Sequence, residues 1–154
     1  MSTSKGDMVV EMYPAIAPVT VDNFLQYVRE GFYKNLIFHR VVATFVTQGG
    51  GFDVNLVPAT THAPIRLESG RGLSNLRGTI AMARTSEPNS ATSQFYFNNF
   101  DNLNLDAASP GNDGYAVFGK IVKGLDVLDA IRVVPVVNSV PTTPVLINNV
   151  TQTQ

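Results

Sequence analysis

The stretch FHRVVATFVTQGGG, residues 38–51, carries the strongest structural signal in this chain. Two apolar runs, 37–42 and 45–48, are short and rich in β-branched and aromatic residues, which is typical of strands. The three glycines after the second run indicate a tight bend or a close approach of the backbone to a neighbouring segment. A phosphate cradle is less consistent with them, because neither a Gly-Lys-Ser/Thr ending nor a helix start follows. The stretch therefore predicts two strands and a closely packed turn.

Arg40 and Gln48 are unusual polar side chains in these two apolar runs. Period-two alternation places Arg40 between Phe38 and Val42 on one face of the first run. In the second run, Gln48 falls on the same face as Val46. Each position alone is explained by an outward-facing residue on a half-solvated sheet, since arginine can lie along apolar surface with its charged end in water. A functional site is the alternative, and the alternation pattern leaves both open.

Outward from this stretch, the chain is a series of short strands with two helices. Further strands are expected at 8–13, 64–67, 79–83, 94–98, 115–122 and 145–147. A helix is expected after Thr20, which can act as its N-cap, and it ends at Gly31, a C-cap glycine; Gly124 begins a second, shorter helix. About eight short strands without long alternating helices predict a mainly β, mainly antiparallel barrel or sandwich, with the two helices at its open ends. One domain is expected over residues 1–154.

The composition excludes several classes of protein. A chain that is 44% hydrophobic and 15% charged is folded rather than disordered. Eleven basic and twelve acidic residues give a formal charge of −1, which offers no electrostatic footprint for nucleic acid or an anionic membrane. The chain has no cysteine, so disulfides, thiolate nucleophiles and zinc–thiolate sites are excluded. No apolar run approaches the roughly 18 residues of a membrane span, and residues 1–7 lack the apolar stretch of a signal peptide.

Metal and nucleophile sites find little support. His39 and His62 lie 23 residues apart, without cysteines or carboxylates that can be placed beside them, so no metal site is predicted. We expect His39 to be a hydrogen-bonded strand residue. The serines include no Gly-x-Ser-x-Gly elbow, which argues against a serine nucleophile.

Four motifs in order give a family resemblance. FHRVVATFVTQGGG resembles the cyclophilin signature FHRxxxxFxxQGG, and GTIAMAR at 78–84 and SQFY at 93–96 resemble the second and third motifs. GYAVFGK at 114–120, followed by GLDVLD, is similar to the strand and helix that complete that fold. The resemblance covers roughly residues 6–150, and GTIAMART and GYAVFGK are typical of the bacterial subgroup. It implies an eight-stranded closed antiparallel β-barrel capped by two α-helices, and an enzyme that isomerises peptide bonds preceding proline without a cofactor.

The resemblance also implies the site residues. Arg40 would donate to the nitrogen of the twisted bond, Gln48 would bond a substrate carbonyl, and Gln94 would support Arg40 or the substrate. The backbone of Ala83 and Arg84 would hold the residues before proline. The apolar proline pocket would be formed by Phe45, Val46, Tyr96 and Leu105.

Three positions depart from the family pattern. Val46 stands where methionine is frequent, which implies a wider or shallower pocket, and Tyr115 aligns with a frequent histidine. Asn104 falls where many members have an aromatic residue, a tryptophan that contacts cyclosporin in the best-known eukaryotic members. The resemblance therefore implies an active enzyme with weak cyclosporin binding.

The implied partners are proline-containing peptides and unfolded polypeptides, and nothing in the sequence demands more than a monomer. One alternative is a proline-peptide binding or chaperone module with little turnover. The presence of Arg40, Phe45 and Gln48 argues against such a loss of catalysis. Another is a small-ligand barrel of the lipocalin type, which needs an unfilled interior that the dense apolar content argues against. The low-charge, cysteine-free composition and the short first strand favour a periplasmic protein whose signal has been removed, with a cytoplasmic one as the alternative.

Overall fold

A six-stranded antiparallel sheet forms the centre of the molecule, in the strand order β3-β8-β6-β7-β5-β4. The computed structural model describes residues 1–108 and 111–153, so Ser109, Pro110 and Gln154 of the expected domain lie outside the described residues. The strands of this sheet are β3 (Val9–Met12), β4 (Arg40–Val41), β5 (Val46–Gly49), β6 (Thr79–Met82), β7 (Phe95–Asn98) and β8 (Val117–Lys123). A three-stranded sheet, β11-β1-β2, and a two-stranded one, β10-β9, complete the strands. Their bounds are β1 (Ser2–Thr3), β2 (Gly6–Asp7), β9 (Val136–Val137), β10 (Val140–Pro141) and β11 (Ile147–Asn149).

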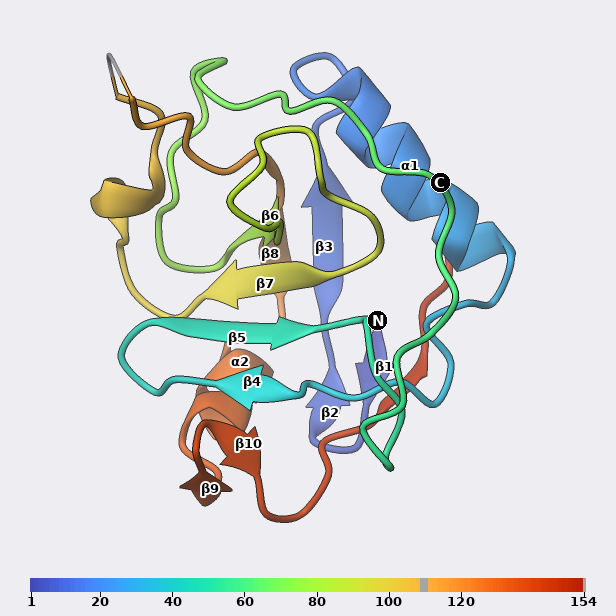
Figure 1. The fold of residues 1–154 in the computed structure, drawn as a ribbon. Coiled ribbons are helices and arrows are strands. Elements are labelled where there is room, and N and C mark those ends of the chain that lie inside the picture. The colour runs from blue at the N-terminus through green and yellow to red at the C-terminus, as the bar shows by residue number, and fades with distance from the viewer. Residues whose placement is uncertain (109–110, 154) are drawn as a thin grey trace.

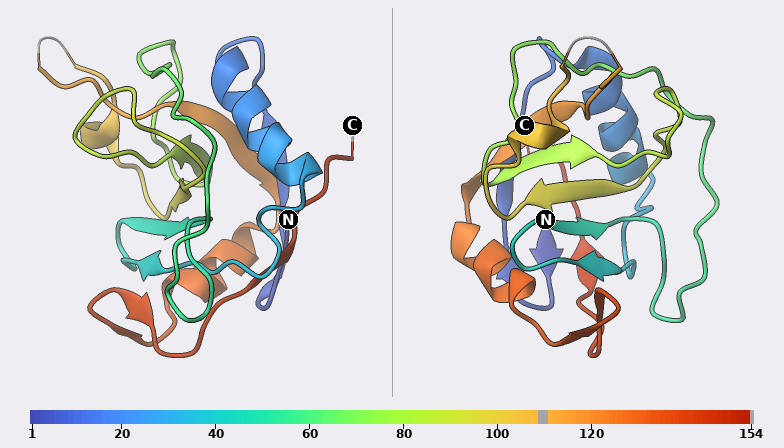
Figure 2. Two further views of the ribbon diagram at one scale, coloured as in Figure 1. Left: turned by 45° about the vertical axis from the view of Figure 1, so that its right-hand side comes forward. Right: turned by 60° about the vertical axis from the view of Figure 1, so that its left-hand side comes forward.

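The two helices lie at opposite ends of the molecule. In Figures 1 and 2, α1 (Pro18–Arg29) lies at the top of every view and α2 (Leu125–Arg132) at the bottom. A single turn of 3-10 helix, η1 (Leu103–Leu105), follows β7. The prediction of a mainly β fold with a helix at each end is therefore confirmed. Within the described residues, neither helix has the length and apolar character needed to cross a membrane.

The predicted closure into an eight-stranded barrel is not confirmed. The strands within 1–108 and 111–153 form three separate sheets, and β3 and β4 are the edges of the largest one. Isolated backbone pairs continue from each edge: Ile37, near β4, bridges to Leu146, and beyond β3 the Met8 N–H donates to the Met1 carbonyl at 2.8 Å. Short stretches of backbone pairing outside the assigned strands thus join the large sheet to the three-stranded one. The Phe38 N–H donates to the Val145 carbonyl at 3.0 Å, the Ile147 N–H donates to the Leu36 carbonyl at 2.8 Å, and the Met1 amino group donates to the Met8 carbonyl at 2.8 Å.

Helix α1 begins earlier than its sequence indicates. Its N-cap is Ala17, which has no capping side chain, and proline occupies its first turn, where a missing N–H costs nothing. Thr20, the predicted N-cap, lies inside the helix. The carboxylate of Glu68 does the capping instead: it accepts the Val19 N–H at 3.2 Å and the Thr20 N–H at 2.8 Å. The predicted end is correct, since Gly31 follows the helix with a left-handed φ of 67°.

Aromatic side chains fill the space between α1 and the face of the large sheet that α1 covers. Phe95, Phe97 and Phe118 from β7 and β8 are 0% exposed, and Phe24 of α1 is 2% exposed. The Phe24 ring centroid lies 5.3 Å from that of Phe118 and 5.6 Å from that of Phe95. Such ring pairs stabilise a fold by more than the free energy of burying their surface. This face of the sheet therefore contributes strongly to the stability of the folded chain.

Candidate active site

Strand register aligns one residue from each of five strands on the opposite face of the large sheet. Arg40 of β4 pairs with Gln48 of β5, and Gln48 pairs with Tyr96 of β7. Tyr96 in turn pairs with Ala81 of β6, which pairs with Val117 of β8. Directly paired residues point to the same face, so the sequence-distant positions 40, 48, 81, 96 and 117 form one row.

The face of Arg40 differs from the expectation that it shares a face with Phe38. Phe38 is 0% exposed in the aromatic core, whereas Arg40 is exposed and lies opposite Gln48. The reason is the length of β4, which contains only two residues, so regular alternation does not extend back to position 38. The expectation for Gln48 and Val46 is correct, because both line the hollow described next.

A hollow of about 140 Å³ lies over this row. All of its lining residues are among the site residues predicted from the sequence. They are Arg40, Phe45, Val46, Gln48, Ala83, Arg84, Tyr96, Leu105 and Tyr115. The lining thus combines apolar and aromatic residues with one amide side chain, Gln48, and two guanidinium groups, those of Arg40 and Arg84.

A chain of side-chain contacts holds Arg40 over the hollow. Gln48 Oε1 accepts from Arg40 Nη1 at 3.4 Å, and Gln48 Nε2 donates to Gln94 Oε1 at 2.9 Å. The Arg40 guanidinium also lies 5.9 Å from the ring centroid of Phe45. A Cβ at position 51 would come within 2.5 Å of the Gln94 side chain, so a larger residue there would displace Gln94 from its position beside Gln48. Across residues 1–108 and 111–153, no carboxylate forms an ion pair with Arg40, which leaves its remaining N–H groups available to a ligand.

Two predicted site residues do not line the hollow. Gln94 accepts a hydrogen bond from Gln48, which in turn accepts from Arg40; its role in supporting Arg40 or the substrate stays a prediction. Asn104 is exposed on η1, and its backbone carbonyl accepts from Asn112 Nδ2 at 3.5 Å. A direct contact of Asn104 with substrate therefore stays a prediction.

Arg84 forms the wall opposite Arg40. Its Nε and Nη2 atoms donate to the Gly114 carbonyl at 3.1 and 2.7 Å, and Nη1 donates to the Thr85 carbonyl at 2.9 Å. The guanidinium lies 4.5 Å from the ring centroid of Tyr115, an arrangement that favours a cation over an aromatic face. The resemblance assigned a role only to the Arg84 backbone, but its side chain is part of the hollow as well.

A buried polar network supports the apolar walls, and sequence reasoning missed it. Asn75, 0% exposed, accepts the Tyr96 hydroxyl at 2.7 Å and donates to Asp106 Oδ1 at 2.8 Å. Asn102 Nδ2 donates to the Phe45 carbonyl at 3.0 Å. These bonds join residues 21 to 57 positions apart in the sequence, so no local sequence pattern predicts them. Burial, above all, raises the pKa of Tyr96, which keeps its hydroxyl a donor to Asn75.

His39 adjoins Arg40 but differs from its prediction. Its Nδ1 atom is buried without a hydrogen-bond partner, and its ring packs edge-on against Phe52 at 4.6 Å. Burial, and then the neighbouring charge of Arg40, lower the pKa of His39 to about 4, so its ring is neutral at neutral pH. Within the described part of the chain, no group of three His, Cys, Asp or Glu side chains is close enough to hold a metal ion.

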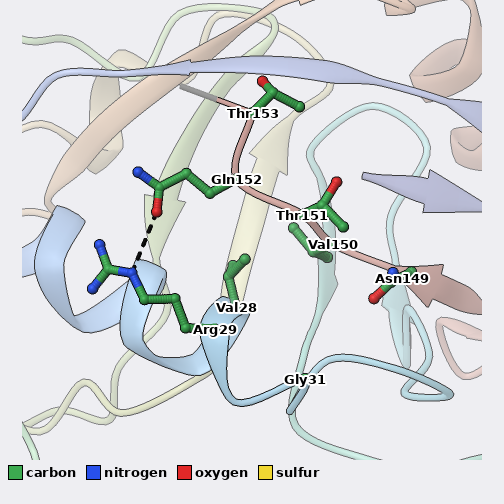
Figure 3. A pocket seen from close by; sticks show the side chains of 8 residues that line it. All are labelled: Val28, Arg29, Gly31, Asn149, Val150, Thr151, Gln152 and Thr153. Atoms are coloured by element: carbon green, nitrogen blue, oxygen red, sulfur yellow. Dashed lines mark hydrogen bonds between the residues drawn. The ribbon is translucent and has the colours of Figure 1, made fainter.

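Larger hollows elsewhere contain none of the predicted site residues. One of about 620 Å³ lies between the end of α1 and the segment 149–153 (Figure 3). Its charged side chain, Arg29, donates to Gln152 Oε1 at 3.3 Å, as the dashed line in Figure 3 marks. Another, of about 560 Å³, lies between β3 and α1 and is lined mainly by apolar side chains. Among the described residues that line these two hollows, the charged side chains are those of Arg29 in the first and Glu11 in the second.

Comparison with known proteins agrees with this geometry. Residues 1–152 match the family described as cyclophilin type peptidyl-prolyl cis-trans isomerase/CLD. A peptidyl-prolyl cis-trans isomerase of Acinetobacter baylyi is 52% identical over 135 residues, which cover 88% of this chain and 71% of that protein. Peptidyl-prolyl cis-trans isomerase B of Escherichia coli is 47% identical over 156 residues, which cover 97% of this chain and 95% of that protein.

A solved structure resembles the fold over nearly its whole length. It is the cyclophilin type peptidyl-prolyl cis-trans isomerase of Cryptosporidium parvum, crystallised in the presence of the dipeptide Ala-Pro. The TM-score is 0.82 at 28% identity, over 97% of this chain and 94% of that one. This chain belongs to the cyclophilin-type peptidyl-prolyl cis-trans isomerases. Its activity is therefore the interconversion of cis and trans peptide bonds that precede proline.

Proposed function

We propose that the hollow holds the proline ring of a peptide and that Arg40 stabilises the twisted peptide bond. The uncatalysed rotation faces a barrier of about 18–20 kcal/mol, because it breaks amide resonance. A catalyst needs neither a nucleophile nor a proton transfer; it must bind the twisted amide better than either planar form. When the bond twists, the nitrogen lone pair leaves conjugation and becomes a better acceptor, so a fixed cationic donor beside it favours the transition state.

The size of the hollow supports a proline ring as its occupant. Its volume of about 140 Å³ is well below the roughly 300–1,000 Å³ of pockets that enclose a drug-sized ligand. Phe45, Val46 and Leu105 offer apolar contacts to one small ring, while Tyr96 forms the floor. The same volume argues against a lipocalin-type ligand site.

Arg40 accounts for only part of the acceleration. A hydrogen bond to a charged group contributes roughly 1.5–3 kcal/mol. A rate gain of about 10⁵ needs about 7 kcal/mol, at 1.36 kcal/mol for each factor of ten. The rest of the stabilisation must come from holding the proline while the preceding residue turns. In this proposal Gln48 bonds a substrate carbonyl, and the backbone of Ala83 and Arg84 pairs with the residues before proline.

The biological part of the proposal is assistance to protein folding. Slow X–Pro isomerisation, over tens to hundreds of seconds, limits the folding of many chains, so a catalyst of this step serves unfolded or exposed segments. The Cryptosporidium parvum relative crystallised with Ala-Pro supports proline-containing peptides as ligands. Weak cyclosporin binding follows in the proposal from Asn104. A monomeric state and a periplasmic location rest on the sequence alone.

The test is magnetisation exchange on a short Ala-Pro-Phe peptide, which needs no coupled protease. We expect Arg40→Ala to lower the enzyme-driven exchange rate by about 10- to 100-fold, in line with one lost charge-assisted bond. Arg66→Ala is the matched control, because Arg66 is an exposed arginine that does not line the hollow. Retained peptide binding with lost exchange supports the assignment. Unchanged exchange in Arg40→Ala would remove Arg40 from the mechanism.

A further inference from the structure

Two guanidinium groups that form no ion pair with a carboxylate of the described residues line the hollow. The chain has seven arginines, and four of them, Arg29, Arg71, Arg77 and Arg132, form ion pairs with carboxylates. In residues 1–108 and 111–153, the arginines without such a pair are Arg40, Arg66 and Arg84. Two of these three line the same small hollow, in a chain whose formal charge is −1.

Arg84 keeps its charge and part of its hydrogen-bonding capacity. All three of its hydrogen bonds go to neutral backbone carbonyl groups, of Gly114 and Thr85, which do not cancel the guanidinium charge. A guanidinium has five N–H groups, so two of them remain after these three bonds. The stacking on Tyr115 holds the group in place, so its orientation costs little entropy when a ligand arrives.

Among the described residues, no carboxylate lines the hollow to balance these two charges. The nearby Asp106 belongs to the supporting network: it accepts from Ser74 and from Asn75, on the far side of Tyr96. Burial acts to raise its pKa, but these hydrogen bonds outweigh burial and lower it, so the charge of Asp106 is held in that network. A peptide in the hollow therefore meets two cations and no facing anion.

The two arginines come to the hollow from different parts of the large sheet. Arg40 lies on β4, and Arg84 follows β6, three strands away in the sheet, or about 14 Å between the backbones. In the proposed pose Arg40 takes the X–Pro bond, and Arg84 approaches the peptide from three strands further along the sheet. It lies within reach of the side chain of a residue beside the proline.

From this geometry we infer that the enzyme prefers peptides with an acidic side chain next to the proline, and that Arg84 is the residue that sets this preference. The inference rests on the proposed role of the hollow as the proline site. An acidic neighbour gains an attraction that a neutral or basic one lacks, and a lysine neighbour is disfavoured by both guanidinium groups. Because the site is open to water, we expect a preference of about two- to fivefold at low salt.

The experiment compares peptides that differ only in charge. One series is Ala-Xaa-Pro-Phe and the other is Ala-Ala-Pro-Xaa, with Glu, Gln or Lys at Xaa, since Glu and Gln have nearly the same shape. Dissociation constants come from chemical-shift titration, and turnover comes from magnetisation exchange on the same samples. The proteins are the intact chain, Arg84→Gln and Arg66→Gln; the last removes the same unit of charge away from the hollow.

We expect the Glu peptide of one series to bind about two- to fivefold more tightly than its Gln counterpart, and the Lys peptide to bind more weakly. This ratio should fall to near one in Arg84→Gln, persist in Arg66→Gln, and shrink at about 1 M salt, where the Debye length is near 3 Å. Equal affinities for Glu and Gln in both series would overturn the inference, as would a ratio that Arg84→Gln leaves intact.

The two readouts separate this inference from the proposed function. Turnover of the Gln peptides without any Glu preference leaves the proposed function standing and removes the inference. A Glu preference in binding without turnover supports the acidic specificity and contradicts the proposed catalytic role of the hollow.

Discussion

The two faces of the large sheet share the same strands and differ in what their side chains do. On one face, Phe95 and Phe97 of β7 pack into an aromatic core that is closed to water. On the other, their neighbour Tyr96 forms the floor of a hollow beside Arg40 and Gln48. The strand period of two thus divides one segment between stability and binding. The difference teaches that substitutions one position apart should have effects of different kinds.

Phe97→Ala should give the largest effect and act on stability. Removing a fully buried ring costs about 3–5 kcal/mol of unfolding free energy, because it loses apolar burial and leaves a cavity. Urea unfolding followed by circular dichroism measures this loss. Exchange activity per folded molecule should stay close to that of the intact chain. Where Phe97→Ala is too unstable to fold, Phe97→Leu provides a smaller version of the same test.

Asn75→Ala should lower both stability and substrate binding, because the buried Asn75 is bonded to Tyr96, which lines the hollow. It leaves the buried Tyr96 hydroxyl without its acceptor, and an unsatisfied buried group costs about 1–3 kcal/mol. The floor of the hollow should then shift, so we expect KM to rise more than kcat falls. Steady-state kinetics alongside urea unfolding measure the two parts.

Tyr96→Phe is the matched control for that variant. It removes the hydroxyl that Asn75→Ala leaves without an acceptor, and Asn75 stays bonded to Asp106. We therefore expect a loss of about 1 kcal/mol in unfolding free energy. A KM as high as that of Asn75→Ala would show that the hydroxyl, rather than Asn75, positions the floor.

His39→Gln should change how the unfolding free energy depends on pH. His39 lies in the chain between Phe38 of the aromatic core and Arg40 of the hollow. The pKa of His39 is lowered from 6.5 to about 4 in the folded chain, so between these values the unfolded chain binds a proton that the folded chain does not. The unfolding free energy must therefore fall as pH falls from about 6.5 to about 4. We expect about 1–2 kcal/mol of this loss to be absent in His39→Gln, a value reduced for the partial exposure of the ring.

The measurement is urea unfolding of both proteins at several pH values. Carboxylates with lowered pKa values, such as Glu68, contribute equally to both proteins and cancel in the difference. A difference between the two proteins that does not vary with pH would contradict the assignment to His39.

The sequence predicted most of the hollow because its lining residues lie in motifs that are contiguous along the chain. Arg40, Phe45 and Gln48 come from a single stretch, and strand pairing brings Tyr96 opposite Gln48. What the sequence could not predict depends on pairing between distant segments. The face of Arg40 depends on how short β4 is, and the position of Asn104 depends on the course of η1.

The supporting contacts were unpredictable for the same reason. In the sequence, Asn75 is one of several asparagines in polar loops, and its role becomes visible only from its bonds to Tyr96 and Asp106 in the fold. Thr20 carries the sequence features of an N-cap, but a carboxylate 48 residues later replaces it. Local propensity is overridden where a tertiary partner satisfies the same backbone groups better.

That distant cap has a consequence for the order in which the chain is made. The first turn of α1 leaves the ribosome before Glu68, which lies 48 positions behind Thr20, has been synthesised. At about 5–20 residues per second, the donors of that turn wait roughly 2–10 seconds for their acceptor during translation. The nascent helix can lengthen toward Arg29 in that interval, but its amino-terminal end is completed only when the middle of the polypeptide emerges.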